Sequence, residues 1–525
     1  MGRKQLKKDG KLEKLNGIAG NYIRMVLYAY LLLQIVVFPF YAPQGYVEIG
    51  ISKYNFFKVS GILCMVIVFP AIVVYLPCVL LKYKKQKQRI SFTLTDKAVL
   101  FYGLAVLLSF ACTAWKEEAV WGAEGWYMGL FSQLMFLVIY FLVSRFTENI
   151  KAWYQLLLAV SFVVFLHGIL NCFSVYPVRM EGSIPGFIST LGNINWFCSY
   201  WMVVFPIGLV LYWIGEEEAV WKKAALIVYV ITGFATGVVQ GSSSAFLALG
   251  AMFLTLLLLS FESSGKLLRW IELGIYFSVS LLLLGAIQGV FPRALNYENA
   301  IEKWLTNYRV AFCIFSFMII LYAAAHYLFQ KKELQIERIC FIQKAIVVLL
   351  FSAVVVIAVL TVYYNFFNHA DTDSKIAQAF VIDEAWGNGR GTTWRTGVEA
   401  FAAMPVWNKL VGVGPDCFYL YAYDQPDIAA RLYSVFGNAR LTNAHNEWLT
   451  VLVDTGILGM ISYAAIFLTA IYGQIKKGKE KNILLVCAVC MISYTVHNMI
   501  SFQQVICTPI MFILIGLGEN LYKKH

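Results

Sequence analysis

A histidine next to an asparagine is the pair of side chains in this chain best suited to moving a proton beside a membrane. His445 and Asn446 stand where a long polar interval, residues 366–444, runs into an apolar stretch. An imidazole titrates near neutral pH, so at a water boundary it can accept a proton from a hydroxyl group. We therefore take His445 as the candidate catalytic residue and Asn446 as the neighbour that supports its position.

Arginines supply the second kind of chemistry, the binding of phosphate groups. A guanidinium group stays charged and can hold a phosphate through two parallel hydrogen bonds. Arg390 has no evident partner in the sequence, whereas Arg395 and Glu399 are spaced to pair along a helix. Arg179 lies in a second polar stretch, residues 176–195, where a snorkelling interfacial arginine is an equally good interpretation.

The polar interval that carries Arg390 is predicted to be a partly helical lid. Thr392 or Thr393 can cap a helix there, and a second amphipathic helix is expected from Asp427 to Phe436. The apolar stripe of the first helix is expected at Trp394, Val398 and Phe401.

No metal or cofactor is expected. Asp371 and Asp373 form an Asp-x-Asp pair, which holds a divalent ion in soluble nucleotide-sugar transferases. No nucleotide-binding βαβ pattern surrounds the pair, so we interpret it as a solvated turn. The sequence Cys487-x-x-Cys490 lies within an apolar run without further ligands, and a redox or metal role is not favoured.

The elements that position these groups are membrane helices. Of the 525 residues, 60% are hydrophobic and 14% are charged, and apolar runs long enough to cross a bilayer recur along the whole chain. These runs predict an all-α polytopic membrane protein with about 14 transmembrane helices (a range of roughly 12–14). The first run has no cleavage site behind it, so no removable signal peptide is expected.

The distribution of basic residues predicts the orientation of these helices. With both termini in the cytoplasm, 28 of the 42 Lys and Arg residues fall in inside segments and 12 in outside loops. The chain then divides into a basic cytoplasmic tail (1–23), helices 1–11 (24–365), a large extracytoplasmic loop (366–444), and helices 12–14 with a cytoplasmic C-terminus (445–525). The net charge of +12 indicates contact with anionic membrane lipid, and no nucleic-acid partner is expected.

The spacing after His445 resembles the signature of a known family. His445-Asn446, nine residues, Gly456, two residues and Gly459 is similar to the pattern of the O-antigen ligase and O-antigen polymerase-like membrane glycosyltransferases. A second stretch, with Arg390, Trp394, Pro405, Gly412 and Gly414, is also similar to that family. The resemblance is sharpest over residues 387–414 and 443–459.

The resemblance implies a GT-C-like fold and a function. Members move a glycan from a polyprenyl (undecaprenyl) diphosphate to an acceptor hydroxyl at the outer face of the cytoplasmic (inner) membrane, in lipopolysaccharide and cell-envelope polysaccharide biosynthesis. It implies that Arg390, Arg395 and Arg179 bind the donor diphosphate, and that Gly456 and Gly459 let a neighbouring helix approach. The partners implied for this protein are the lipid-linked donor, an acceptor and membrane lipids.

The chain departs from the family at two places. Met460 and Ile461 replace the usual Thr-Thr after the last glycine, and Ser242, Ser243 and Ser244 stand where members carry Ser-Arg. Ser242 and Ser243 are therefore candidates for holding the anion, with another arginine as the alternative.

Several alternatives stay open from the sequence. The acceptor can be a lipid-linked core sugar, a growing capsular or surface polysaccharide, or a protein hydroxyl, as in protein O-oligosaccharyltransferases. A lipid or solute transporter is the other class, but it predicts charged or broken helices at the midplane and matching halves, which we do not find. His497-Asn498, in another predicted helix, either lines the site or bonds to a neighbouring helix.

Overall fold

Each apolar stretch that is predicted to cross the membrane folds as a helix. The computed structural model describes residues 2–86, 91–182, 186–216, 219–291, 300–367, 380–384 and 386–524. The long helices are α1 (Gly2–Leu32), α2 (Ile49–Lys85), α3 (Leu94–Cys112), α5 (Leu130–Phe146), α6 (Ile150–Cys172), α7 (Ile194–Ile214), α8 (Val220–Val239), α9 (Ser243–Ser260), α10 (Ser264–Val290), α12 (Tyr308–Gln330), α13 (Cys340–Val362), α19 (Glu447–Gly478), α20 (Leu484–His497) and α21 (Thr508–Lys523).

Shorter elements connect them. The connecting helices are α4 (Lys116–Trp121), α11 (Ala300–Leu305), α15 (Trp386–Ala403), α16 (Val406–Val411), α17 (Phe418–Asp424) and α18 (Pro426–Phe436). Short 3-10 or π segments are η1 (Leu33–Val37), η2 (Phe38–Phe40), η3 (Ile336–Ile339) and η4 (Tyr363–Phe367). The described residues contain one two-stranded antiparallel sheet, β1 (Phe187–Ile188) with β2 (Gly192–Asn193).

The predicted class, an all-α polytopic membrane protein, is confirmed. Among the described residues, eleven helical segments are long and apolar enough to cross a membrane, and α5 and α20 are shorter apolar helices. The basic tail is continuous with the first of these segments, because α1 begins at Gly2. The total of 14 spans stays a prediction.

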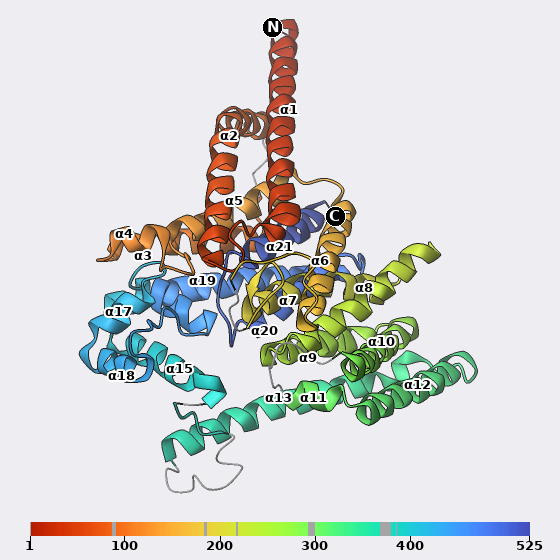
Figure 1. The fold of residues 1–525 in the computed structure, drawn as a ribbon. Coiled ribbons are helices and arrows are strands. Elements are labelled where there is room, and N and C mark those ends of the chain that lie inside the picture. Colours follow the sequence, from red (N-terminus) through yellow and green to blue (C-terminus); the bar gives the residue numbers. More distant parts are fainter. Residues whose placement is uncertain are drawn as a thin grey trace.

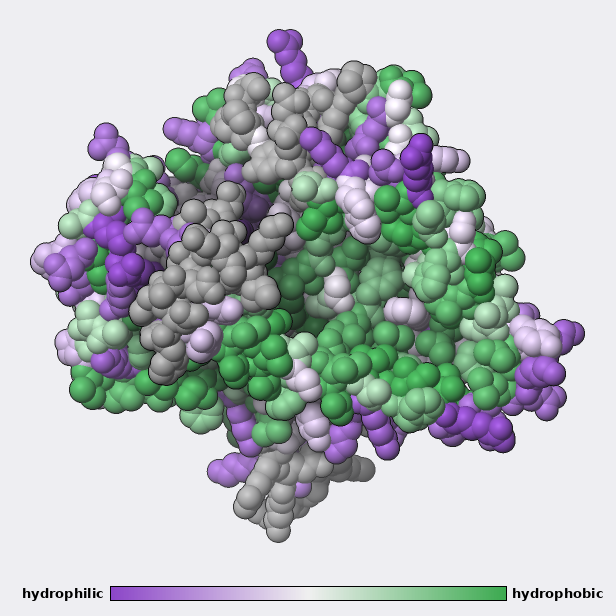
Figure 2. All heavy atoms as spheres, turned by 90° about the horizontal axis from the view of Figure 1, so that it is seen from below, coloured by the Kyte–Doolittle hydropathy of each residue, from purple (hydrophilic) through white to green (hydrophobic). Residues whose placement is uncertain are grey.

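The core lies where α7, α20 and α21 meet, at the centre of the molecule (Figure 1). On α7, Trp201 and Trp213 are completely buried. By contrast, α13 carries no buried residue, and Leu349 and Phe351 point outward from it. The face seen in Figure 2 is largely hydrophobic, as expected for a surface in contact with lipid.

Hydrogen bonds join distant segments that the sequence assigns to the same side of the membrane. On the predicted outer side, the Tyr46 N–H donates to the Glu181 carbonyl at 2.8 Å. On the same side, the Ala123 N–H donates to the Asp416 carboxylate at 2.7 Å, which joins the turn after α4 to the large loop.

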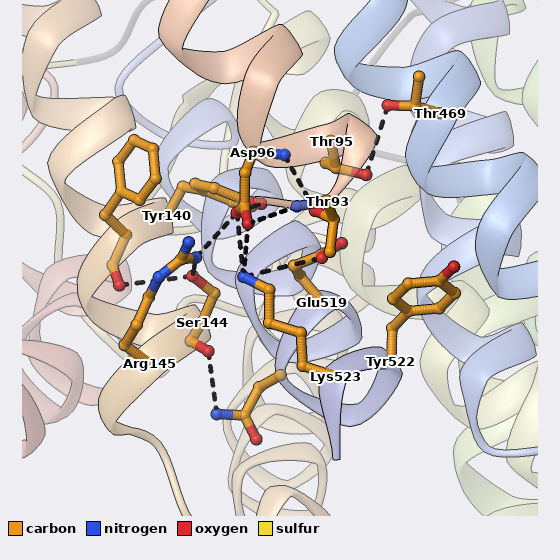
Figure 3. Close-up of polar contacts among 12 residues, drawn as sticks. Thr93, Thr95, Asp96, Tyr140, Ser144, Arg145, Thr469, Glu519, Tyr522 and Lys523 are labelled. Atoms are coloured by element: carbon orange, nitrogen blue, oxygen red, sulfur yellow. Dashed lines mark hydrogen bonds and ion pairs between the residues drawn. The ribbon is translucent and has the colours of Figure 1, made fainter. Parts of the chain in front are cut away.

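A cluster of charges ties helices together on the opposite side (Figure 3). The buried Asp96 carboxylate at the start of α3 pairs with Arg145 of α5 and with Lys523 of α21, each at 2.9 Å. Elsewhere on that predicted side, Lys266 donates to the Asn482 side chain at 2.8 Å. A buried carboxylate with two cationic partners keeps its charge, so the cluster fixes these three helix ends.

The large loop has a hydrophobic core of its own. Residues of α15, α17 and α18 pack together with Ala119 of α4 and with Val453 of α19. The expected second helix is present as α18, with Ile428 and Leu432 buried. The loop is therefore an ordered helical body over its described residues.

The first loop helix differs from the prediction. It begins at Trp386, before the expected caps, and Thr392 and Thr393 lie inside it and are buried. The expected stripe is wrong at Val398, which is 57% exposed, whereas Phe401 packs against the loop core. The buried residues of the helix include five small ones: Thr392, Thr393, Thr396, Gly397 and Ala400.

Candidate active site

The chain enters α19 through a tight turn that holds His445 in place. His445 has a φ of 47°, and its N–H donates to the Asn443 side chain at 2.9 Å. The Asn446 side chain caps α19 by accepting from the Leu449 N–H at 3.1 Å. Asn446 therefore supports His445 by fixing the start of the helix. The edge of the imidazole packs against the Phe502 ring, with centroids 5.1 Å apart.

Arg390 lies close to this histidine. Its Nε donates to the Ile500 carbonyl at 3.2 Å and its Nη1 to the Gly387 carbonyl at 2.8 Å. Burial and the positive charge of Arg390 together lower the pKa of His445 to about 4. The site therefore combines a neutral imidazole with a fixed cation. These are the two kinds of group that the sequence predicted for proton transfer and for phosphate binding.

Small residues on α15 bring Arg390 to this position. A Cβ at Gly397 would meet the side chains of Ala444 and Leu449 at 3.4 and 3.5 Å. The loop helix thus packs directly against the residues on either side of His445. This close contact explains the glycine at position 397.

Gly456 breaks the regular helix of α19, and the backbone of the large loop packs against it at this break. Its φ of 68° is a conformation that favours glycine, and a Cβ there would lie 2.4 Å from the Leu410 backbone. The break frees carbonyl groups of the preceding turn, and the loop satisfies them. The Val413 N–H donates to the Val453 carbonyl at 3.2 Å, and the Gly414 N–H donates to the Asp454 carbonyl at 3.0 Å.

The two family glycines thus have different neighbours. The close approach expected at Gly456 is made by the loop backbone at the end of α16. At Gly459 a Cβ would collide with the Thr455 side chain of the same helix.

Arg395 points away from His445. Its Nε donates to Glu399 Oε1 at 2.7 Å, and Arg431 of α18 binds the other carboxylate oxygen at 2.6 Å. Burial alone would raise the pKa of Glu399, but the hydrogen bonds from Arg395 and Arg431 hold it below its usual value. Arg395 therefore takes part in a bridge between two loop helices, as its spacing to Glu399 indicated.

The other predicted anion-binding groups lie in separate segments. Arg179 is exposed, and within the described residues no contact joins it to His445 or Arg390. The Ser242 hydroxyl donates to the Asn195 side chain at 3.3 Å, and Ser243 is exposed at the start of α9. Asp371 and Asp373 lie outside the described residues.

One buried acid beside His445 was not predicted from the sequence. Glu447 follows Asn446, is 1% exposed, and accepts hydrogen bonds from Tyr463, Tyr494 and Asn498. The sequence did contain a signal for this residue, because a carboxylate directly after His445-Asn446 falls in the first turn of a predicted membrane helix. His497, one residue before Asn498, bonds to the Asn498 side chain through Nδ1 at 2.9 Å.

Comparisons with known proteins cover the part of the chain that carries this site. Residues 304–464 match the family model described as O-Antigen ligase. This segment is similar to the O-antigen ligase family. The O-antigen ligase match includes Arg390, Arg395, His445, Gly456 and Gly459, and it ends before His497.

A curated relative points in the same direction. The exopolysaccharide production protein ExoQ of Rhizobium meliloti (strain 1021) is 32% identical over 91 residues. The aligned stretch covers 17% of this chain and 19% of ExoQ. The sequence similarity to ExoQ is therefore restricted to one segment of each protein.

Proposed function

We propose that this protein is a membrane glycosyltransferase that moves a glycan from a polyprenyl diphosphate to an acceptor hydroxyl. The observation that carries the proposal is the neutral imidazole of His445 beside Arg390, within the segment that matches the O-antigen ligase family. Transfer requires a base for the hydroxyl and positive charge for the leaving diphosphate, and these two residues supply them.

The proposed reaction exchanges one bond at the anomeric carbon of the donor glycan. The acceptor hydroxyl oxygen attacks this carbon while its proton passes to His445. The bond from the carbon to the diphosphate oxygen breaks, and the lipid diphosphate leaves with its electron pair beside Arg390. Because the donor carries its own leaving group, no nucleotide is needed, and the proposed role of Arg390 is to offset part of the negative charge of the diphosphate without a metal.

The choice of acceptor belongs to this proposal as well. The relative's printed name, exopolysaccharide production protein, favours a growing polysaccharide as acceptor. A ligase that uses a lipid-linked core sugar and a protein O-oligosaccharyltransferase are the competing versions.

Reconstitution tests the reaction. We expect the purified protein in liposomes to transfer glycan from a polyprenyl-diphosphate donor and to release polyprenyl diphosphate, with the rate unchanged by a metal chelator. Products are measured by mass spectrometry with polysaccharide, core-sugar and peptide acceptors in parallel. An intact donor with every acceptor would refute the proposed activity, and loss of transfer in chelator would refute metal independence.

The proposal also places the large loop outside the cytoplasmic membrane, with both termini inside. In a background with the exposed Cys112 and Cys313 replaced by serine, Asn438→Cys in the exposed end of the loop should react with an impermeant thiol reagent in intact cells. The matched control, Lys479→Cys, should react only after permeabilisation. The reverse pattern would overturn the orientation.

A further inference from the structure

The carboxylate of Glu447 is held inside the protein by three donors. Tyr463 donates to Oε1, Tyr494 donates to Oε2 at 3.1 Å, and Asn498 donates to Oε2 through its side-chain amide. An acid at this depth of a membrane protein is costly to bury, and such groups are retained for a purpose. Glu447 therefore requires an explanation beyond packing.

Glu447 is joined to Asn498 by its main chain as well as by its side chain. The Glu447 N–H donates to the Asn498 carbonyl at 2.9 Å. Since Asn498 ends α20, these two bonds fasten the end of that helix to the first turn of α19. The pair lies 51 residues apart in the chain.

The turn that follows Asn498 supports both proposed functional groups. The carbonyl of Ile500 accepts the Nε–H of Arg390 at 3.2 Å. Two residues later, the Phe502 ring packs against the edge of the His445 imidazole. A shift of this turn would move the arginine and the histidine relative to each other.

The surroundings of Glu447 are almost closed to solvent. The side chain is 1% exposed, and the cavity that it lines, together with Tyr102 and Gln503, has about 30 Å³ of space for water. Its hydrogen bonds go to Tyr463, Tyr494 and Asn498.

We propose that Glu447 is a positioning residue for glycan transfer, and that its bond to Asn498 sets the relative placement of His445 and Arg390. The inference rests on the proposed function. Rates of transfer are sensitive to placement, since a displacement of about 1 Å can cost about 10²-fold. The role of Glu447 is therefore to hold geometry, while proton transfer and charge neutralisation belong to the other two residues.

A charge-conserving exchange tests this role. Glu447→Gln keeps one acceptor oxygen and turns an NH₂ group toward either Asn498 or a tyrosine donor, and Asn498→Asp places a carboxylate against the Glu447 carboxylate. Each single variant should lower kcat about 10²-fold with a smaller change in KM. The double variant Glu447→Gln/Asn498→Asp restores a donor opposite an acceptor and should recover most of the kcat.

Further variants separate positioning from general structural support. Tyr154→Phe removes a buried tyrosine hydroxyl that bonds to Cys487 and not to Glu447, so its kcat should stay near wild type. If Glu447→Gln does not accumulate in the membrane, Asn498→Ser removes the amide donor, keeps the carboxylate with its tyrosines, and should show the same loss of kcat.

The outcomes of the exchange are distinct. A wild-type protein without transfer activity would refute the proposed function. With an active wild type, the inference fails if the single variants keep full kcat, if the double variant is as slow as they are, or if the loss follows yield and melting temperature alone.

Discussion

Replacing His445 by alanine is expected to lower the rate of glycan transfer by about 10²–10⁴-fold, the usual contribution of a positioned base. The side chain makes no hydrogen bond that holds the described part of the fold together, since the turn is fixed by the His445 N–H and by the Asn446 cap. Membrane yield and melting temperature should therefore stay near wild type. Rates per folded molecule are measured with the reconstituted protein.

The exposed His326 of α12 provides the matched control for this substitution. His326→Ala should transfer glycan at the wild-type rate. Full turnover in His445→Ala would refute the catalytic assignment and leave only the membrane architecture.

The pH dependence gives a second measurement of the same role. Because burial and Arg390 lower the pKa of His445 to about 4, the imidazole of the free protein is neutral at pH 7. The acid limb of kcat/KM should therefore lie well below pH 6.5. A bound diphosphate offsets the charge of Arg390, so the acid limb of kcat should lie at higher pH than that of kcat/KM. Identical limbs near pH 6.5 would contradict this arrangement.

Arg390→Lys is expected to remove most of the activity, although the positive charge is retained. A lysine ammonium is a point charge and cannot reproduce the planar fork that binds two phosphate oxygens. It also lacks the Nε–H that reaches the Ile500 carbonyl. We expect a loss of about 10²-fold or more in kcat/KM, measured with the polyprenyl-diphosphate donor.

The control for this charge is Arg440→Lys. Arg440 is exposed at the end of the loop, and its substitution should be nearly silent. Arg431, which the sequence alone suggests as a neutral comparison, is unsuitable because it binds Glu399 and links α18 to α15. Equal losses at Arg390 and Arg440 would mean that the loop arginines act structurally.

The sequence by itself determined most of the helical architecture, because the formation of a membrane helix depends on local composition. In lipid every backbone polar group must bond within its own segment, so an apolar run of sufficient length becomes a helix. The distribution of Lys and Arg predicted which connections share a side, and contacts such as Asp96 with Lys523 join segments assigned to the same side. The spacing of His445, Gly456 and Gly459 predicted the family that residues 304–464 match.

The tertiary structure decided which side chains meet. The sequence predicted a glycine suited to close approach at Gly456, but only the packed chain shows that loop residues 410–414 fill the break in α19. The family resemblance assigned Arg395 and Arg390 to the same anion, yet Arg395 pairs with Glu399 within its own helix, and only the packed chain places Arg390 beside His445. The sequence did not predict that Glu447 and Asn498 bond to each other. Local periodicity determines only where the helices form and which faces they present. Contacts between residues this far apart depend on how the helices pack.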